Sequence, residues 1–228
     1  LHEKPFAGIN GSGKHNNWSL ATDSGENLLE PGADPEKNLS FLLFFCAVIQ
    51  AVDDYGDLLR LSVATAGNDH RLGGNEAPPA IVSMFIGEDL DGVLTRIEEG
   101  REPQAGETVT MTAGARVLPH FVKDTTDRNR TSPFAFTGNK FEFRMPGSAL
   151  SAAEPNIVLN TAVADVLREF AGRLEPYREN GFAEAARELL RDVIRRHRRI
   201  IFNGNGYAEE WVKEAHRRGL SDLSDCAK

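Results

Sequence analysis

The sequence predicts an α+β protein in which long helices accompany several short strands. Residues 35–55, 154–174 and 182–202 place apolar side chains at helical spacing over lengths that are typical of long helices. Residues 141–144, Phe-Glu-Phe-Arg, alternate apolar and charged side chains, as a half-buried strand does. Residues 80–86 are apolar and rich in β-branched side chains, which indicates a buried strand. The 228 residues are enough for one large domain.

The first long helix has boundary signals at both ends. Asp34 is a favourable N-cap, Pro35 suits the first helical position, and Gly56 is the expected end. The middle of this helix, residues 39–49, is apolar on nearly all sides, so we expect deep burial. It is shorter than the roughly 20 residues of a membrane span.

The other elements are assigned with the same signals. We expect strands at residues 4–11, 18–22, 58–66 and 108–112, and helices at residues 89–100 and 207–218. The first two strands can pair as a hairpin. Residues 67–79 contain three glycines and two prolines and are an expected surface loop, and residues 118–139 are dense in charge and irregular.

The composition argues against several classes of function. A net charge of −8 gives no general affinity for DNA or anionic membranes. Cys46 and Cys226 lie far apart and form no zinc-ligand pattern, which suits a reducing cytosol. We therefore expect a cytoplasmic protein with no nucleic-acid partner and no membrane partner. Residues 195–199 form a basic run that we expect to be solvated or to contact an acidic neighbour.

The glycine-rich residues 10–15, Asn-Gly-Ser-Gly-Lys-His, are the first candidate site. Glycine lets a backbone pass close to a ligand with its N–H groups turned inward. His15, at the end of this loop, suits a metal ligand or an acid–base group. The alternative interpretation is a plain hairpin turn with one polar histidine.

Several charged residues can join His15. The carboxylate of Glu142 lies on a charged strand face, and Glu76 lies in the glycine-rich loop. The candidate cations are Arg71, Arg130, Lys140 and Arg144. One histidine and one carboxylate suit Mg²⁺ or Mn²⁺ when a phosphate supplies further ligands, and arginine grips phosphate and carboxylate in bidentate fashion. This combination fits phosphoryl transfer from ATP to a small acid.

The motifs resemble those of the glutamine synthetase family. Residues 10–15 are similar to its Asn-Gly-Ser-Gly-Met-His signature, with Lys14 in place of methionine. Arg71 with residues 76–78 (Glu-Ala-Pro) resembles its glutamate-binding arginine and flap. Residues 129–130 (Asn-Arg) and 140–144 (Lys-Phe-Glu-Phe-Arg) resemble its phosphate-contacting pair and its Arg-x-Glu-x-Arg strand. The motifs occur in the family's order, and Lys14 together with residues 68–71 is similar to the type III branch.

The resemblance implies a fold and a reaction. The fold would be part of a glutamine synthetase/guanido kinase-like catalytic domain, with a curved antiparallel sheet flanked by long helices. Residues 1–203 would be the C-terminal part of that domain, and residues 204–228 would begin a helical extension. The reaction would join ammonia to glutamate through a γ-glutamyl phosphate made with ATP. The implied assembly is a large homo-oligomeric ring.

The resemblance also implies a role for each site residue. His15 and Glu142 would ligate Mg²⁺ or Mn²⁺ on the ATP phosphates. Substrate glutamate would be held by Asn10, Gly11, Arg71 and Arg144. Arg130 and Lys140 would neutralise the transferring phosphate, with Ser19 near the nucleotide. Glu76 would close over the site and help to take a proton from ammonium.

Some positions depart from the family pattern, and some alternatives remain. Asn17 stands where many members carry a second histidine, Ala135 where other branches carry an arginine that Arg128 can replace, and Lys140 where an arginine would offer a fork. We expect the family's other metal carboxylates upstream of this chain, which makes the chain an incomplete and inactive fragment by itself. The alternatives are a γ-glutamyl-amine ligase of the same family and a catalytically silent structural homologue.

Overall fold

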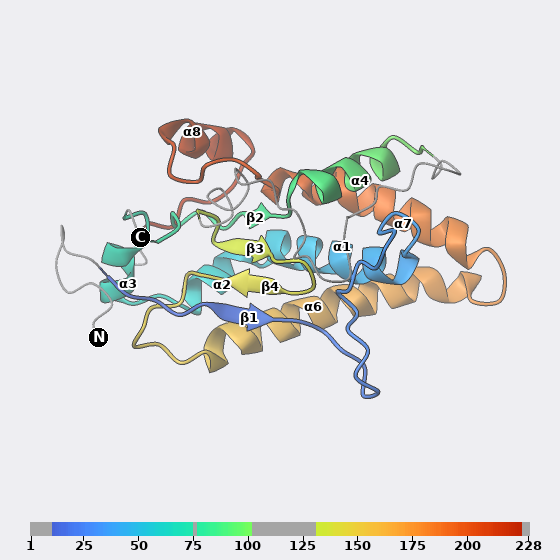
Figure 1. Cartoon of the computed structure of the whole chain (residues 1–228), viewed down its shortest axis with the longest axis horizontal. Helices are drawn as coiled ribbons and strands as arrows, with labels where there is room; N and C mark the ends of the chain where they lie inside the picture. Colours follow the sequence, from blue (N-terminus) through green and yellow to red (C-terminus); the bar gives the residue numbers. More distant parts are fainter. Residues whose placement is uncertain (1–10, 75–76, 102–130, 225–228) are drawn as a thin grey trace.

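The structure is a computed structural model that describes residues 11–74, 77–101 and 131–224 (Figure 1). The strands are β1 (Asn16–Trp18), β2 (Met84–Phe85), β3 (Phe134–Phe136) and β4 (Phe141–Phe143). The helices are α1 (Leu39–Asp54), α2 (Gly56–Leu61), α3 (Ala66–Arg71), α4 (Glu88–Glu98), α6 (Ala153–Leu174), α7 (Phe182–His197) and α8 (Glu209–Arg217). The strands expected at residues 4–11 and 108–112 lie outside the described residues. The α+β class is confirmed.

The strands form one sheet in the order β1-β4-β3-β2. β4 is antiparallel to both β1 and β3, whereas β2 is parallel to β3. The expected antiparallel arrangement is therefore found for β1, β4 and β3, and it is wrong for β2. In the described part of the chain β2 is followed by α4, and a parallel pair requires such a crossover connection; residues 102–130 of the connection lie outside the described residues.

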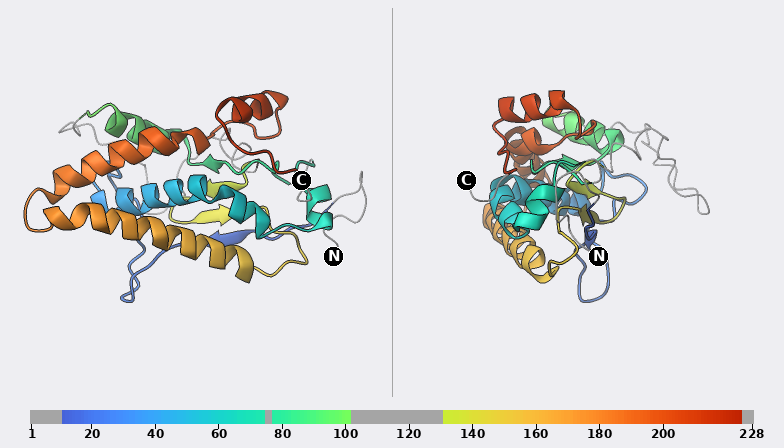
Figure 2. Two further views of the ribbon diagram at one scale, coloured as in Figure 1. Left: turned by 180° about the vertical axis from the view of Figure 1, so that it is seen from behind. Right: turned by 90° about the vertical axis from the view of Figure 1, so that its left-hand side faces the viewer.

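Three long helices cover one face of this sheet. α1 packs against both α6 and α7, and the view from behind in Figure 2 shows these helices in front of the strands. The expected stripe of α6 is confirmed, since Leu159, Val163, Val166, Phe170 and Leu174 are all buried. No described helix combines the length and the apolar character needed to cross a bilayer.

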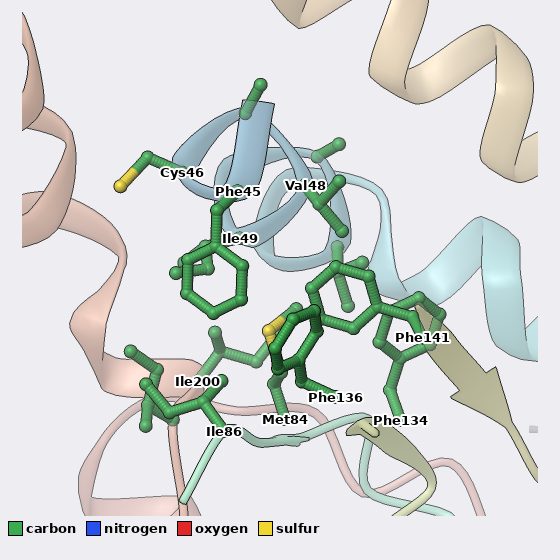
Figure 3. Close-up of a cluster of buried hydrophobic side chains, with 14 of the residues drawn as sticks. Phe45, Cys46, Val48, Ile49, Met84, Ile86, Phe134, Phe136, Phe141 and Ile200 are labelled. Atoms are coloured by element: carbon green, nitrogen blue, oxygen red, sulfur yellow. The ribbon is translucent and has the colours of Figure 1, made fainter. Parts of the chain in front are cut away.

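Aromatic side chains fill the space between α1 and the strands. Phe45 of α1 lies 5.1 Å from Phe136 of β3 and 5.6 Å from Phe141 of β4, between ring centroids. Figure 3 shows these rings together with Met84 and Ile200 in one apolar cluster. Cys46 is buried on the same helix, and burial raises the pKa of its thiol to about 12. Residues 39–49 are therefore the buried segment that the sequence predicts.

The boundaries of α1 differ from those expected. The N-cap is Asn38, whose Oδ1 accepts a hydrogen bond from the Phe41 amide at 3.1 Å, and residues 35–37 form turns before it. Asp34 instead pairs with Lys37 at 2.7 Å, which lowers the pKa of Asp34. Gly56 does not end the helical region, because α2 begins there. Asp34 was the wrong choice because Asn38 is an equally good cap one turn later.

Two further expectations between β1 and β2 are wrong. Residues 58–66, expected as a strand, form most of α2, a turn and the start of α3. Residues 67–79, expected as a surface loop, begin with α3, whose Asn68 and Arg71 are buried. Tertiary packing overrides the β-branched composition here, since buried Leu59 and Val63 contribute to the core from a helix and a turn.

The other expected elements are found with shifted ends. The strand expected at 18–22 shares only Trp18 with β1, which lies earlier in the chain and pairs with β4. The strand expected at 80–86 shortens to β2, the helices at 89–100 and 207–218 are α4 and α8, and α7 ends at His197 before a short 3₁₀ turn. The basic run contacts acidic neighbours, as one of its two interpretations predicted: Arg198 pairs with Asp91 at 2.6 Å and Glu98 at 2.9 Å.

Candidate functional site

The two faces of the sheet carry different side chains. The register pairs Asn17 and Ala135 with Glu142 from either side, so these three share the face opposite to the aromatic core. His15 and Ser19 flank β1, and Lys140 and Arg144 flank β4, each two residues from Asn17 or Glu142 and therefore of the same parity. We call this surface of His15, Asn17, Ser19, Lys140, Glu142 and Arg144 the polar face. In Figure 1 no described helix crosses in front of the sheet.

The centre of the polar face is a contact between His15, Glu142 and Arg144. Nδ1 of His15 lies 2.5 Å from Oε1 of Glu142, and Nη2 of Arg144 donates to the other carboxylate oxygen at 2.5 Å. The side chain of His15 is 64% exposed, whereas those of Glu142 and Arg144 are 13% and 8% exposed. Arg144 thus binds one carboxylate oxygen of Glu142. The other oxygen lies beside the imidazole of His15 on the open side of the sheet.

Ser19 and Lys140 lie at the other end of the polar face. Oγ of Ser19 lies 2.7 Å from Oδ1 of Asn27 and 3.2 Å from the carbonyl oxygen of Asn139. The side-chain amide of Asn27 donates to that same carbonyl at 2.8 Å. The Lys140 side chain makes no hydrogen bond or ion pair with any described residue, so its charge is available to an anion.

The glycine loop is fastened to the segment that follows β4. Gly13 bridges to Gly147, and the Lys14 amide donates to the Pro146 carbonyl at 2.9 Å. The ammonium group of Lys14 donates to the carbonyl oxygens of Ser148 and Leu150. Lys14 therefore stabilises the loop by binding protein backbone. Gly11, expected to contact substrate through its backbone, stands half-buried at the start of the described loop.

Arg71 lies beneath this loop. Its Nη1 donates to Oδ1 of Asn68 at 3.1 Å and to the carbonyls of Met145 and Pro146 at 3.0 and 3.2 Å. Its Nη2 donates to the carbonyl of Arg144 at 3.1 Å. The structure thus joins Arg71 to the backbone of Arg144, so the two arginines expected to hold glutamate are neighbours.

Three residues expected at the site, Asn10, Glu76 and Arg130, lie outside the described residues. The structure brings together His15, Glu142 and Arg144 directly, with Ser19 and Lys140 on the same face and Arg71 behind the glycine loop.

A second group of possible metal ligands occurs elsewhere in the described ranges. Asp53, Asp54 and His197 offer ligand atoms within 4.8 Å of one another. Both oxygens of Asp53 already accept from Nε of Arg199 at 3.0 Å, and Nδ1 of His197 lies 2.8 Å from one of them. This group is accounted for as an ion-pair network between α1 and the end of α7.

Sequence reasoning missed the asparagines that support the site. Asn16 and Trp18 of β1 donate to Asn156 and Asn160 of α6, each at 2.8 Å. The signal was present, because Asn16 and Trp18 are two apart on a strand while Asn156 and Asn160 are four apart on a helix. Asn68 gave no such signal, since its partners Val63 and Met145 include one that is 77 residues away.

Comparison with known proteins identifies the family of this chain. The chain is 52% identical over 224 residues to the type-3 glutamine synthetase of Dictyostelium discoideum, which covers 98% of this chain. This chain belongs to the glutamine synthetase family. Glutamine synthetases from Butyrivibrio fibrisolvens and Bacteroides fragilis (strain YCH46) are 50% and 48% identical over 99% and 98% of the chain.

The matches cover only part of those relatives. The chain spans 30%, 32% and 31% of their lengths, in the same order. A family profile described as "Glutamine synthetase C-terminal domain" matches residues 185–228, which include most of α7 and all of α8. The polar face lies outside that profile match and within the region shared with the three relatives.

Proposed function

We propose that this chain supplies part of the active site of a glutamate–ammonia ligase, in a protein of full family length. The observation that carries the proposal is the contact of His15 with Glu142 and of Glu142 with Arg144 on one face of the sheet. The relatives at about half identity are named glutamine synthetases, which supports the reaction class. The remaining parts of the site, and the ring of subunits that the family resemblance implies, would come from outside this chain.

The donor set at His15 and Glu142 fits a divalent cation. One imidazole nitrogen of His15 and one carboxylate oxygen of Glu142 lie in direct contact, 2.5 Å apart, and a bound ion would take the place of this contact. Mg²⁺ and Mn²⁺ accept oxygen and imidazole ligands, and these ions keep further places for phosphate and water. When bound, such an ion neutralises charge on the ATP phosphates. Arg144 holds the carboxylate of Glu142 in one orientation for this role.

Each of the other candidate site residues has a proposed role. Lys140 lies beside Glu142 and would neutralise the γ-phosphate during transfer to the glutamate γ-carboxylate, with Arg130 as the second cation. Ser19 would lie near the nucleotide. Arg71, Arg144, Asn10 and the Gly11 backbone would hold glutamate, because a guanidinium matches a carboxylate.

The reaction would proceed in two steps. The γ-carboxylate oxygen of glutamate attacks the γ-phosphorus of ATP, and ADP leaves. Ammonia then attacks the carbonyl carbon of the γ-glutamyl phosphate, and the carbon–oxygen bond to phosphate breaks, which gives glutamine and inorganic phosphate. Glu76 would exclude water and take the proton from ammonium.

The test is phosphate release from ATP in the protein of full family length and in the chain alone. Release that requires both glutamate and ammonium, in the longer protein only, supports the proposal. Turnover with an organic amine but not with ammonium would establish the amine-ligase alternative. Turnover with neither nucleophile in the longer protein would establish the catalytically silent alternative, and ammonium-dependent turnover by the 228 residues alone would contradict the division of the site.

A further inference from the structure

We propose that Asn68 is a positioning residue that sets where the guanidinium of Arg71 lies, and thereby how tightly glutamate binds. This inference rests on the proposed function, in which Arg71 holds glutamate. Asn68 is fully buried and is reached by no solvent, so its polar atoms act only on other parts of the protein. Thr65 begins α3 by capping the amide of Asn68 at 3.1 Å, which fixes the backbone from which the side chain projects.

The side-chain amide of Asn68 connects three segments. Its Nδ2 donates to the carbonyl of Val63 at 2.7 Å and to the carbonyl of Met145 at 2.9 Å. Its Oδ1 accepts from Nη1 of Arg71 at 3.1 Å. The Met145 carbonyl also accepts from Nη1 of Arg71, so Asn68 and Arg71 share one acceptor. An isosteric aliphatic side chain would leave that guanidinium one buried acceptor short.

The glycine loop restricts Arg71 from the other side. A Cβ atom at Gly13 would lie only 2.0 Å from Nη2 and 2.3 Å from Cζ of Arg71. The guanidinium therefore packs directly against the backbone of the loop that carries Gly11 and His15. Asn68 and Gly13 thus contact the guanidinium of Arg71, which also donates to the carbonyl of Arg144.

A fixed guanidinium matters for affinity. Arginine binds a carboxylate well only when its fork is held in the right plane, because ordering a free side chain costs entropy. A loosened Arg71 would weaken glutamate binding in the ground state and the transition state alike. Such a change raises KM for glutamate and leaves kcat nearly constant.

The experiment compares KM for glutamate, KM for ATP and kcat in the protein of full family length. Asn68→Ala is expected to raise KM for glutamate about tenfold, with kcat and KM for ATP within about twofold. Gly13→Ala is expected to do the same without making a cavity, because the new methyl group displaces the guanidinium. In an Arg71→Ala background, Asn68→Ala is expected to add nothing to KM for glutamate.

The matched control is Asn203→Ala. The side chain of Asn203 also binds backbone, because its Oδ1 accepts hydrogen bonds from the amides of Ile86 and Gly87 at 3.0 and 2.9 Å. This contact lies beyond the sheet edge opposite to β1. It is expected to leave KM for glutamate unchanged at equal loss of thermal stability. Unchanged KM for glutamate in folded Gly13→Ala or Asn68→Ala, or full additivity with Arg71→Ala, would overturn the inference.

Failure of the proposed function is distinguishable from failure of this inference. A wild-type protein with no glutamate-dependent turnover would refute the function. Crystal structures of the wild type and of Gly13→Ala would still decide the positioning claim, through the location of the Arg71 guanidinium. An unmoved guanidinium in Gly13→Ala would overturn the claim even then.

Discussion

The two faces of strand β4 are built from alternate residues of one short segment and have opposite properties. Phe141 and Phe143 point to α1 and are fully buried, whereas Glu142 between them points to the open side of the sheet. The aromatic face holds the strands in register through ring contacts such as Phe134 with Phe141 at 5.1 Å. The polar face uses that rigid register to bring His15 against Glu142 across two strands.

The contrast teaches that alternate residues of one strand have different tasks. One set packs into the core, and the other set forms the candidate site. On the polar face, the carboxylate of Glu142 meets the side chains of His15 and Arg144. Lys14 precedes His15 by one residue, so its side chain is on the side of the aromatic face. It binds the carbonyl oxygens of Ser148 and Leu150, which are protein backbone. The following predictions can break this division.

Glu142→Gln is expected to have the largest effect on activity. It removes the charge that binds Arg144 and that, in the proposed site, would ligate the cation, so glutamate- and ammonium-dependent phosphate release should fall by about a hundredfold or more. Steady-state assays of the protein of full family length measure this. The control is Glu179→Gln, on the exposed connection between α6 and α7. Equal rates in Glu142→Gln and wild type would remove Glu142 from the site.

Phe141→Ala is expected to have the largest effect on stability. Removing a fully buried ring should cost about 3–5 kcal/mol of unfolding free energy, because a cavity remains. Denaturant titration of the same variant and of Phe182→Ala measures the difference. Phe182 is 41% exposed, so its truncation should cost less than about 1 kcal/mol. Similar losses in both variants would mean that the aromatic face does not carry the fold.

The two faces also differ in how far sequence predicts them. The alternation of residues 141–144 predicts β4 and its two faces, and the family resemblance implies that His15 joins Glu142. The start of α1 was misplaced because Asp34 and Asn38 are both good caps, and the structure uses Asn38. Contacts such as Asn68 with Met145 join residues 77 apart, and no local pattern encodes them.

Lys14→Met tests, with a smaller expected effect, the claim that Lys14 supports the fold and takes no part in the chemistry. The loss of two hydrogen bonds from a charged donor to backbone should lower the unfolding free energy by about 1–2 kcal/mol. Turnover should stay within about threefold of wild type, because Lys14 faces protein backbone. Lys213→Met, at an exposed position of α8, is the control for stability. A loss of turnover as large as that of Glu142→Gln would contradict this claim.

Glu214→Gln should have the smallest effect, since Glu214 belongs to neither face. Hydrogen bonds from Arg217 and Arg218 lower the pKa of Glu214 from 4.5 to about 2. A depressed carboxyl pKa stabilises the fold above the unfolded value of 4.5, and this contribution is lost as the pH falls through about 2. Thermal unfolding between pH 2 and 7 should therefore show a small deficit in Glu214→Gln at pH 7 that vanishes near pH 2. A deficit that grows toward low pH would refute this sign.

The central claim is that the polar face holds a divalent cation through His15 and Glu142. The most direct measurement is the electron spin-echo spectrum of Mn²⁺ bound to the protein of full family length, which detects coupling to an imidazole nitrogen. The account predicts that His15→Gln abolishes this coupling and that His197→Gln, in the other group of possible ligands, leaves it unchanged. Coupling that persists in His15→Gln, or disappears in His197→Gln, would contradict the account.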